Sequence, residues 1–252
     1  MYKRYLQVCD KAITDTEIWK TFRNSDDYCS ILEHKNYSQF GRMFLDAIHV
    51  VATQNEITVP FTEIMKNDTI GGPQMFEYSL GGYSIVCSPT TLRYVLTGLK
   101  TLSHMKDIGI KEVDIVEIGA GYGGQCRVIY LLAPLFEIKI NSYGIFDLDA
   151  PMKLQAKYLT ELGDVPMDHI TFNTPDDHHL NENSFLISNY CISEIEASQR
   201  DEYYAKILRP YISHGYLYWN IADYSSIVML YQRIKIVPED PCTNHCNVEI
   251  SF

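Results

Sequence analysis

Residues 113–124 read Val-Asp-Ile-Val-Glu-Ile-Gly-Ala-Gly-Tyr-Gly-Gly, and the architecture of the chain is predicted from this stretch outward. An apolar run reaches the acid Glu117, glycines follow, and a helical pattern continues over residues 125–135. Glycine suits positive φ or a ligand lying against the main chain. The free N–H groups at the start of a helix favour a negative group. We therefore predict a strand, a tight turn and a helix, with a ligand bound at the turn.

Beyond the turn, strand and helix patterns alternate to the end of the chain. The predicted strands cover residues 114–118, 139–146, 170–172, 185–189 and 216–221, with a closing hairpin of 234–237 and 248–250. The predicted helices among them cover residues 151–162, 198–208 and 227–232. This alternation is typical of an α/β fold with a mainly parallel sheet and helices on both faces.

The chain before the turn is predicted to be mostly helical. Apolar residues recur at helical spacing over residues 13–22 and 41–53, and Ser88 is a suitable N-cap for a further helix. Residues 60–89 are rich in turn-forming dipeptides and are interpreted as a connector with binding potential. The resulting domain prediction is an N-terminal helical lid or substrate region, residues 1–110, and a cofactor-binding core, residues 111–252.

Composition argues against several classes of function. The net charge of −11 over 252 residues repels a polyanion, so nucleic acid is not expected as a partner. No apolar run approaches the ~18 residues of a membrane helix, and the first residues show no signal-peptide pattern. Seven scattered cysteines favour reduced thiols. We expect a cytoplasmic protein without membrane contacts, and leave a homodimer open.

The glycine spacing leaves the choice of nucleotide open. Gly119, Gly121 and Gly124 fit G-x-G-x-x-G, which also marks dinucleotide-binding folds. However, the carboxylate of Glu117 suits a positive group better than a pyrophosphate, and the remaining chain is short for a dinucleotide domain plus a catalytic domain. Asp147, which ends the second strand, can accept both ribose hydroxyls. S-adenosylmethionine, with its sulfonium and amino group, fits these acids. The alternative is a turn that serves packing alone.

Four segments together point to a family. They read Ser-Pro-Thr-Thr-Leu-Arg-Tyr (88–94), Glu-Ile-Gly-Ala-Gly-Tyr-Gly-Gly (117–124), Tyr-Gly-Ile-Phe-Asp-Leu (143–148) and Ser-Asn-Tyr-Cys-Ile-Ser-Glu (188–194). They resemble the sugar O-methyltransferase family of the class I S-adenosylmethionine-dependent methyltransferases. That family occurs in polysaccharide-building clusters and in glycan-building proteins of large DNA viruses, where the compartment would be the host cytoplasm. The resemblance covers roughly residues 60–250.

The resemblance implies a fold, a cofactor and a reaction. The implied fold is a Rossmann-like sheet of seven strands whose last strand is antiparallel. The implied cofactor is S-adenosylmethionine, which leaves as S-adenosylhomocysteine. The implied reaction methylates a hydroxyl of a sugar or glycan acceptor, which is free, nucleotide-linked or at a glycan end, for example a deoxyhexose such as rhamnose. The family pattern names no catalytic base.

Ligands of open α/β sheets bind beyond the carboxyl ends of the strands, so the candidate residues follow each strand. The residues expected to hold the cofactor are Arg93, Glu117, Gly119, Ala120, Gly121, Tyr122, Asp147, Leu148, Asp176 and Asn189. Arg93 is expected to pair with the methionine carboxylate, and Asp176 suits the adenine amino group. Each of these two residues can instead be an ordinary surface charge.

A sugar hydroxyl is a poor nucleophile at neutral pH, so a base must take its proton. Glu194, after the fourth strand, is the first candidate, followed by Asp223 and His178. The competing interpretations are a helix-terminal acid, an N-cap acid and a polar loop residue, in that order. The residues expected to contact the sugar are Tyr78, Tyr83, Tyr190, Asn220 and Tyr224. Aromatic rings stack on sugar faces, although tyrosine is equally a strand and core residue.

The same sequence suggests two other functions, and it contains one possible metal site that is not part of the prediction. Cys242, His245 and Cys246 supply three ligands for zinc, but no second cysteine pair is nearby, so no metal is predicted. The glycine spacing permits an NAD(P)-dependent sugar reductase or dehydrogenase. A catalytically silent partner subunit with the same fold is the third hypothesis.

Overall fold

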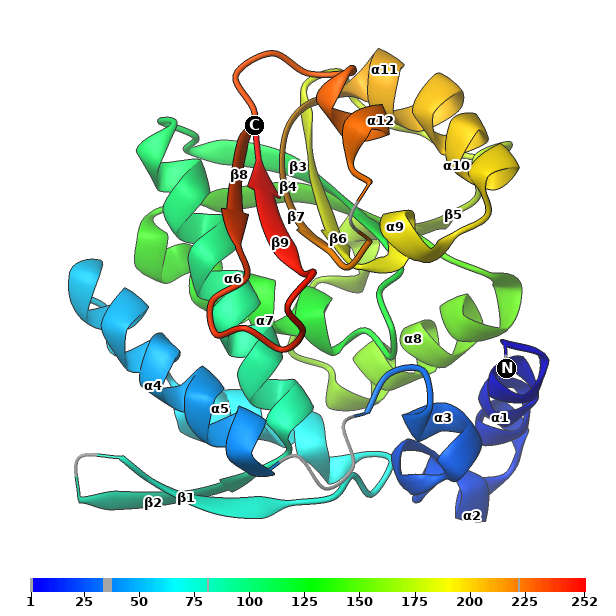
Figure 1. Cartoon of the computed structure of the whole chain (residues 1–252). Helices are drawn as coiled ribbons and strands as arrows, with labels where there is room; N and C mark the ends of the chain where they lie inside the picture. The colour runs from blue at the N-terminus through cyan, green and yellow to red at the C-terminus, as the bar shows by residue number, and fades with distance from the viewer. Residues whose placement is uncertain (1, 34–37, 81, 222) are drawn as a thin grey trace. The chain divides into compact units, whose positions relative to one another are not determined.

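The computed structural model describes residues 2–33, 38–80, 82–221 and 223–252 (Figure 1). This part of the chain divides into two compact units. The helical unit comprises Met1–Ser103, Gly121–Phe136 and Asp149–Val165, and the sheet unit comprises His104–Ala120, Glu137–Leu148 and Pro166–Phe252. The chain thus passes from one unit to the other inside the glycine turn. The predicted domains, residues 1–110 and 111–252, stay a prediction.

Within the described residues, the sheet unit holds a seven-stranded sheet in the order β5-β4-β3-β6-β7-β9-β8. Its strands are β3 (Glu112–Ile118), β4 (Lys139–Phe146), β5 (Ile170–Asn173), β6 (Ser184–Asn189), β7 (Ile212–Trp219), β8 (Lys235–Pro238) and β9 (Val248–Ser251). Neighbouring strands are parallel, except that β9 is antiparallel to both β7 and β8. The predicted α/β, Rossmann-like sheet with an antiparallel last strand is confirmed.

The order of the strands creates a switch point beside β3. From β3 the chain adds β4 and then β5 on one side, and it then returns to place β6 and β7 on the other side (Figure 1). In such sheets the crevice at the carboxyl ends of the strands, where the order reverses, is the usual ligand site. The loops after β3, β4 and β6 therefore carry the candidate site.

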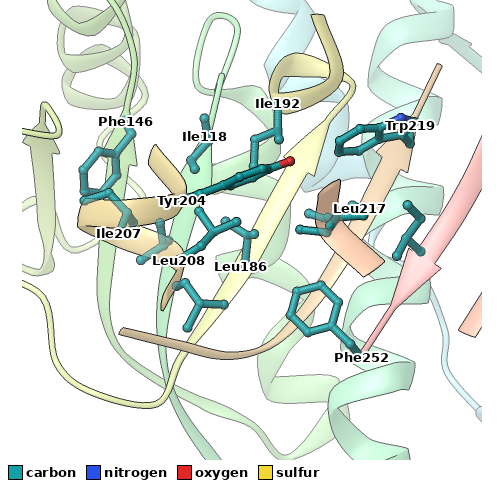
Figure 2. Close-up of a cluster of buried hydrophobic side chains, with 14 residues drawn as sticks. Ile118, Phe146, Leu186, Ile192, Tyr204, Ile207, Leu208, Leu217, Trp219 and Phe252 are labelled. Carbon is teal, nitrogen blue, oxygen red and sulfur yellow. The ribbon is translucent and has the colours of Figure 1, made fainter. Parts of the chain in front are cut away.

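A cluster of buried side chains covers one face of the sheet (Figure 2). Its strand members include Ile118, Leu186 and Trp219, and its helical members include Ile192 and Leu208. The helical segments of the sheet unit are η4 (Met167–His169), α9 (Cys191–Glu194), α10 (Ala197–Tyr203), the π-helical turn η5 (Tyr204–Leu208), α11 (Arg209–Tyr211) and α12 (Ser225–Val228). Burial of these apolar surfaces fixes α9 and η5 against the strands.

The helical unit contains the N-terminal helices and the two helices that follow β3 and β4. Its elements are α1 (Tyr2–Thr14), α2 (Thr16–Trp19), η1 (Phe22–Asn24), α3 (Asp26–Cys29), α4 (Ser38–Gln54), α5 (Phe61–Ile64), η2 (Met65–Thr69), β1 (Phe76–Leu80), β2 (Tyr83–Cys87), α6 (Pro89–Asp107), α7 (Gly124–Leu132), η3 (Ala133–Phe136) and α8 (Asp149–Leu162). Helix α6 extends past Ser103, the last residue of this unit before the turn. None of the helices in the described ranges combines the length and apolar character of a membrane span.

Two predictions for the N-terminal part were wrong in detail. The predicted helix over residues 13–22 is broken, because the Asp15 side chain accepts the N–H groups of Glu17 and Ile18 and starts α2 there. The connector over residues 60–89 contains the antiparallel hairpin of β1 and β2. The two strands of the hairpin were not predicted, because turn-forming residues surround each short strand in the sequence. The N-cap role of Ser88 is confirmed, since its Oγ accepts the Thr91 N–H at 3.1 Å.

Two fully buried arginines tie the N-terminal segments of the helical unit to α7. Arg23 binds Glu33 (Nε to Oε1, 2.5 Å) and Asp68 (Nη2 to Oδ1, 3.0 Å). Arg127, on α7, binds Asp164 and donates to Asn67 Oδ1 at 2.7 Å. The Asn67 carbonyl oxygen accepts in turn from Arg23 at 2.7 Å. In this network each buried guanidinium group has carboxylate and carbonyl acceptors. Removing one partner would leave the other buried charge uncompensated, which is strongly destabilising.

Candidate functional site

The first half of the glycine turn lies in the sheet unit, directly after β3. Gly119 has φ +79, and a Cβ there would lie 2.3 Å from Cys191 Cβ. Only glycine combines this conformation with such a close neighbour. The Gly119 N–H donates to the Phe146 carbonyl oxygen at 2.9 Å. The turn is thereby fixed against the end of β4 and the start of α9.

Asp147 organises the end of β4. Its Oδ2 accepts the Ala120 N–H at 3.2 Å, and its Oδ1 accepts the Leu148 N–H at 2.8 Å. The carboxylate therefore bridges the glycine turn and the loop after β4, and the side chain is only half-buried. Leu148 is half exposed. An acid held in this way can also receive hydroxyl donors from a ligand.

Glu117 is a carboxyl group enclosed in the sheet, with 1% of its surface exposed. The Tyr143 hydroxyl donates to its Oε2 at 2.9 Å, while its Oε1 has no hydrogen-bond partner among the described residues. Burial raises the pKa of Glu117 to about 8, and the negative charge of Asp147 adds to the rise, against the opposing hydrogen bond from Tyr143. A buried acceptor atom left open in this way is suited to a cationic ligand.

Acids converge on the thiol of Cys191, the first residue of α9. Burial raises the pKa of this thiol, and the negative charges of Asp147, Glu194 and Glu117 raise it further. The pKa of the Tyr203 hydroxyl is raised in the same way. Burial is the largest cause, and negative charge on Cys191 and Asp147 adds to the rise. Three carboxyl groups from three different strand ends therefore act on one spot. The local potential favours a cation and opposes a phosphate.

Glu194 meets Asn220 across two neighbouring strand ends. Glu194 ends α9, which follows β6, and Asn220 follows β7. The Asn220 Nδ2 group donates to Glu194 Oε1, and Asn220 Oδ1 lies 2.7 Å from the Ser193 hydroxyl. The structure thus brings together a predicted catalytic residue and a predicted substrate-binding residue. Glu194 remains exposed to solvent, so an acceptor can approach it on that side.

The other predicted catalytic residues lie in different surroundings. Asp223 Oδ1 accepts the backbone N–H and the hydroxyl of Ser225, and these hydrogen bonds lower the pKa of Asp223. Asp223 lies in the loop before α12, whose N-cap is Tyr224, and the catalytic role of Asp223 stays a prediction. The His178 ring packs between Phe146 and Tyr211, with centroids 6.0 and 5.3 Å away.

The remaining predicted residues of the sheet unit occupy several loops. Asp176 forms an exposed ion pair with Lys206, so its assignment to adenine stays a prediction. Asn189 ends β6, and Tyr190 follows it with φ +68, an uncommon conformation for a side chain of this size. The Tyr190 hydroxyl donates to Glu239. Tyr224 packs at the edge of the hydrophobic cluster.

The second half of the glycine turn lies in the helical unit, where Gly121 and Gly123 have φ +59 and +94. Tyr122 is fully buried between them, with its ring 4.0 Å below the Arg23 guanidinium and 4.9 Å from the Tyr158 ring. Its side chain therefore contributes to the core of this unit. A Cβ on Gly121 would lie 2.9 Å from the Tyr94 hydroxyl, so the main chain is closely packed here too.

Three further predicted residues belong to the helical unit. Arg93 lies on α6, and its guanidinium is 5.7 Å from the centroid of the Tyr94 ring. The Tyr78 hydroxyl lies against Gly41 of α4, where a Cβ would come within 2.0 Å of it. The Tyr83 side chain falls outside the described residues. The sugar-binding roles of both tyrosines stay predictions.

Sequence reasoning missed the supporting residues of the site. These are Tyr143, Cys191, Ser193, Tyr203 and Glu239. Tyr143 could have been found, because β4 neighbours β3 in the predicted sheet and Tyr143 lies two residues before Ile145, the residue opposite Glu117. Cys191 contacts Gly119, and Glu239 contacts Tyr190. Each contact joins segments that are distant in the sequence, so no local pattern predicts it. Within the described ranges, no group of three histidine, cysteine, aspartate or glutamate residues is arranged to hold a metal ion.

Comparison with known proteins finds likeness in solved structures only. The chain matches no family model. No curated protein matches it either. The family resemblance of its four segments therefore stays a prediction.

Three solved structures illustrate the likeness. TrmK of M. capricolum, in complex with S-adenosylhomocysteine, is 13% identical over 60% of this chain and 65% of its own, with a TM-score of 0.40. A SAM-dependent methyltransferase of Aquifex aeolicus is 12% identical over 59% and 86%, with a TM-score of 0.43. Phosphoethanolamine N-methyltransferase 2 of Haemonchus contortus, in complex with S-adenosylmethionine, is 16% identical over 56% and 39%, with a TM-score of 0.41. The chain spans slightly less than two thirds of TrmK.

Proposed function

We propose that the chain is an S-adenosylmethionine-dependent methyltransferase that methylates a hydroxyl of a sugar. The observation that carries the proposal is the buried carboxyl of Glu117, whose Oε1 lacks a partner among the described residues, beside Asp147 and the Gly119 turn. These groups lie at the switch point of the sheet, where such folds bind ligands. A buried, unsatisfied acceptor in a field of other acids calls for a cation.

The charge of the site favours this cofactor over a dinucleotide. The carboxylates of Asp147 and Glu194 act together on Cys191, and a pyrophosphate at this point would meet like charge. We assign the binding of the cofactor's amino group to Glu117 and the binding of its ribose hydroxyls to Asp147. Gly119 has no side chain, so the turn between these two acids packs directly against Cys191. When bound, the cofactor supplies an electrophilic methyl group.

The acceptor is assigned from the groups beyond the cofactor residues. We assign the proton of the hydroxyl to Glu194, because it follows β6 beside the glycine turn and is exposed to solvent, whereas Asp223 lies in the loop before α12 and accepts from Ser225. Proton removal as the new bond forms typically contributes 10²–10⁴-fold in rate. Holding the hydroxyl in line contributes much of the rest. The choice of a sugar rests on the four resembling segments, and the exposed side of Glu194 is compatible with it.

A binding experiment separates the proposal from its rivals. Isothermal titration of the protein with S-adenosylmethionine, S-adenosylhomocysteine, NADH and NADPH is expected to show binding of the first two only. Mass spectrometry of a panel of monosaccharide glycosides, incubated with protein and S-adenosylmethionine, then reports a gain of one methyl group. Binding of a nicotinamide nucleotide instead would favour a reductase. Absence of binding by every one of them would favour a silent partner subunit.

A further inference from the structure

The carboxylate of Glu194 is held at one oxygen by a residue from another strand. Asn220 follows β7, which runs parallel beside β6 with Asn189 opposite Tyr218. The Asn220 Nδ2 group donates to Glu194 Oε1. An ionised carboxylate only accepts hydrogen bonds, so the amide of Asn220 must turn its NH₂ group towards Glu194. The amide oxygen then faces the other way.

Ser193 fixes that orientation of the amide. Its hydroxyl lies 2.7 Å from Asn220 Oδ1 and 2.6 Å from the Tyr190 carbonyl oxygen, and the Asn220 N–H reaches Ser193 Oγ at 3.4 Å. A reversed amide would place its oxygen against the Glu194 carboxylate, which is repulsive. Because Ser193 is 2% exposed, water cannot easily replace its hydroxyl. The hydroxyl has one proton, and it supports the productive orientation when it donates that proton to Asn220 Oδ1 in place of the Tyr190 carbonyl oxygen.

The frame behind Ser193 is tied to three strand ends. Tyr190 donates its backbone N–H to the Tyr218 carbonyl oxygen at 2.8 Å, and its hydroxyl to Glu239 at the end of β8. Glu239 is buried and also accepts the Thr243 N–H at 2.9 Å. On the other side, Ile192 packs into the hydrophobic cluster (Figure 2). The short helix that carries Glu194 is thus held in place on both sides.

We infer that Asn220 and Ser193 are positioning residues for Glu194: Asn220 holds the Glu194 carboxylate, which receives the acceptor's proton, and Ser193 fixes Asn220. This inference rests on the proposed function and assigns Asn220 a role through Glu194, in place of the direct sugar contact predicted from the sequence. The O–H bond of the acceptor breaks, its proton goes to the Glu194 carboxylate, and its electron pair forms the new O–CH₃ bond while the C–S bond of the cofactor breaks towards sulfur.

A double-mutant cycle on methyl transfer tests the inference. Asn220→Ala is expected to lower kcat about tenfold, the loss of one charge-assisted hydrogen bond, with the KM for the acceptor changed less than about twofold. In an E194Q background the same substitution is expected to change kcat by less than about twofold, because a residue that acts through Glu194 has nothing left to position. An equal loss in both backgrounds, or a loss in KM alone, would overturn the inference.

Ser193 is tested with a matched control. Ser193→Ala is expected to lower kcat about as much as Asn220→Ala, and Ser193→Thr, which keeps the hydroxyl, is expected to restore most of it. Ser184→Ala is the control: Ser184 is equally buried, begins β6, the strand that precedes α9, and donates to the Asn181 carbonyl oxygen at 2.7 Å. It is expected to affect stability without lowering kcat. A kcat loss in Ser184→Ala equal to that in Ser193→Ala would refute a positioning role.

A readout without turnover separates this inference from the proposed function. In nitrogen-15 NMR spectra, the two side-chain amide protons of Asn220 are expected to be well separated, and E194A is expected to bring them together. Unchanged amide signals in E194A would refute the contact, whatever reaction the protein performs. If the signals respond but wild-type protein methylates no acceptor, the contact stands, and both the proposed function and the role assigned to Asn220 fall.

Discussion

Replacing Glu117 with glutamine removes the charge that this carboxyl can acquire while keeping its shape. The wild-type group lies buried beside Tyr143, Asp147 and Cys191, and burial raises its pKa from 4.5 to about 8. The folded protein therefore holds this proton more tightly than the unfolded chain does. Its stabilising contribution is complete below about pH 4.5 and is lost as the pH rises through about 8.

The size of the effect follows from the proton difference between the two states. While the folded form is protonated and the unfolded form is not, the free energy of unfolding falls by about 1.4 kcal/mol per pH unit. From about pH 5.5 to about pH 7.5 the Glu117 carboxyl thus removes about 2–3 kcal/mol of stability. A glutamine at this position does not titrate. Glu117→Gln is therefore expected to lose about 2–3 kcal/mol less than the wild type over the same interval.

The assay is urea unfolding of both proteins at the two pH values, with a reductant present to keep the cysteine side chains as thiols. Glu112→Gln serves as the control, since Glu112 is an exposed acid at the start of the same strand. It is expected to follow the wild-type pH dependence. If Glu117→Gln also follows the wild-type curve, the carboxyl is not held protonated at neutral pH, and the argument for an open acceptor inside the sheet fails.

Four other outcomes are expected. Binding of S-adenosylmethionine at about pH 7 should release close to one proton from the wild type and none from Glu117→Gln, as measured by calorimetry in buffers of different ionisation heat. Equal proton release by both proteins would exclude Glu117 as the source. Asp147→Ala should weaken cofactor binding on the order of 100-fold by the same method, and unchanged affinity would remove Asp147 from the site. Gly119→Ala should destabilise the protein by at least about 2 kcal/mol, less when Cys191→Gly is added, and wild-type stability would contradict the close packing of the turn. Arg23→Ala should cost about 3–5 kcal/mol in denaturant unfolding because it leaves buried carboxylates unpaired, and a cost below about 1 kcal/mol would contradict that network.

The sequence predicted those features that depend on neighbouring residues. The strand, turn and helix around Gly119 follow from an apolar run and adjacent glycines, and the closing hairpin follows from two short β-branched runs at the end of the chain. Glu117 and Asp147 were identified in the same way, because each lies at the end of an apolar run that predicts a strand. The broken helix at Asp15 shows the limit of periodicity: a capping side chain ended one helix and began another inside an unbroken apolar pattern.

The features that escaped the sequence depend on contacts between distant segments. Nothing near Cys191 indicates that it packs on Gly119, and nothing near Tyr190 indicates that its hydroxyl reaches Glu239. Tyr122 is a further case. Its place in the turn predicted a cofactor contact, which stays a prediction, and no pattern in the sequence indicated that its side chain is buried against Arg23 and Tyr158.

The glycine spacing alone does not distinguish a pyrophosphate from a sulfonium, because both need a close approach to the main chain. What separates them is the charge that the strands carry to that point. Glu117 is enclosed with an acceptor oxygen unused among the described residues, and Asp147 and Glu194 add further negative charge around Cys191. Keeping such a group buried costs stability at neutral pH. A ligand that brings a positive charge to Glu117 recovers that cost on binding, whereas an anion would increase it. Under the proposed function, the acids around the turn, more than the glycines in it, decide which cofactor the chain selects.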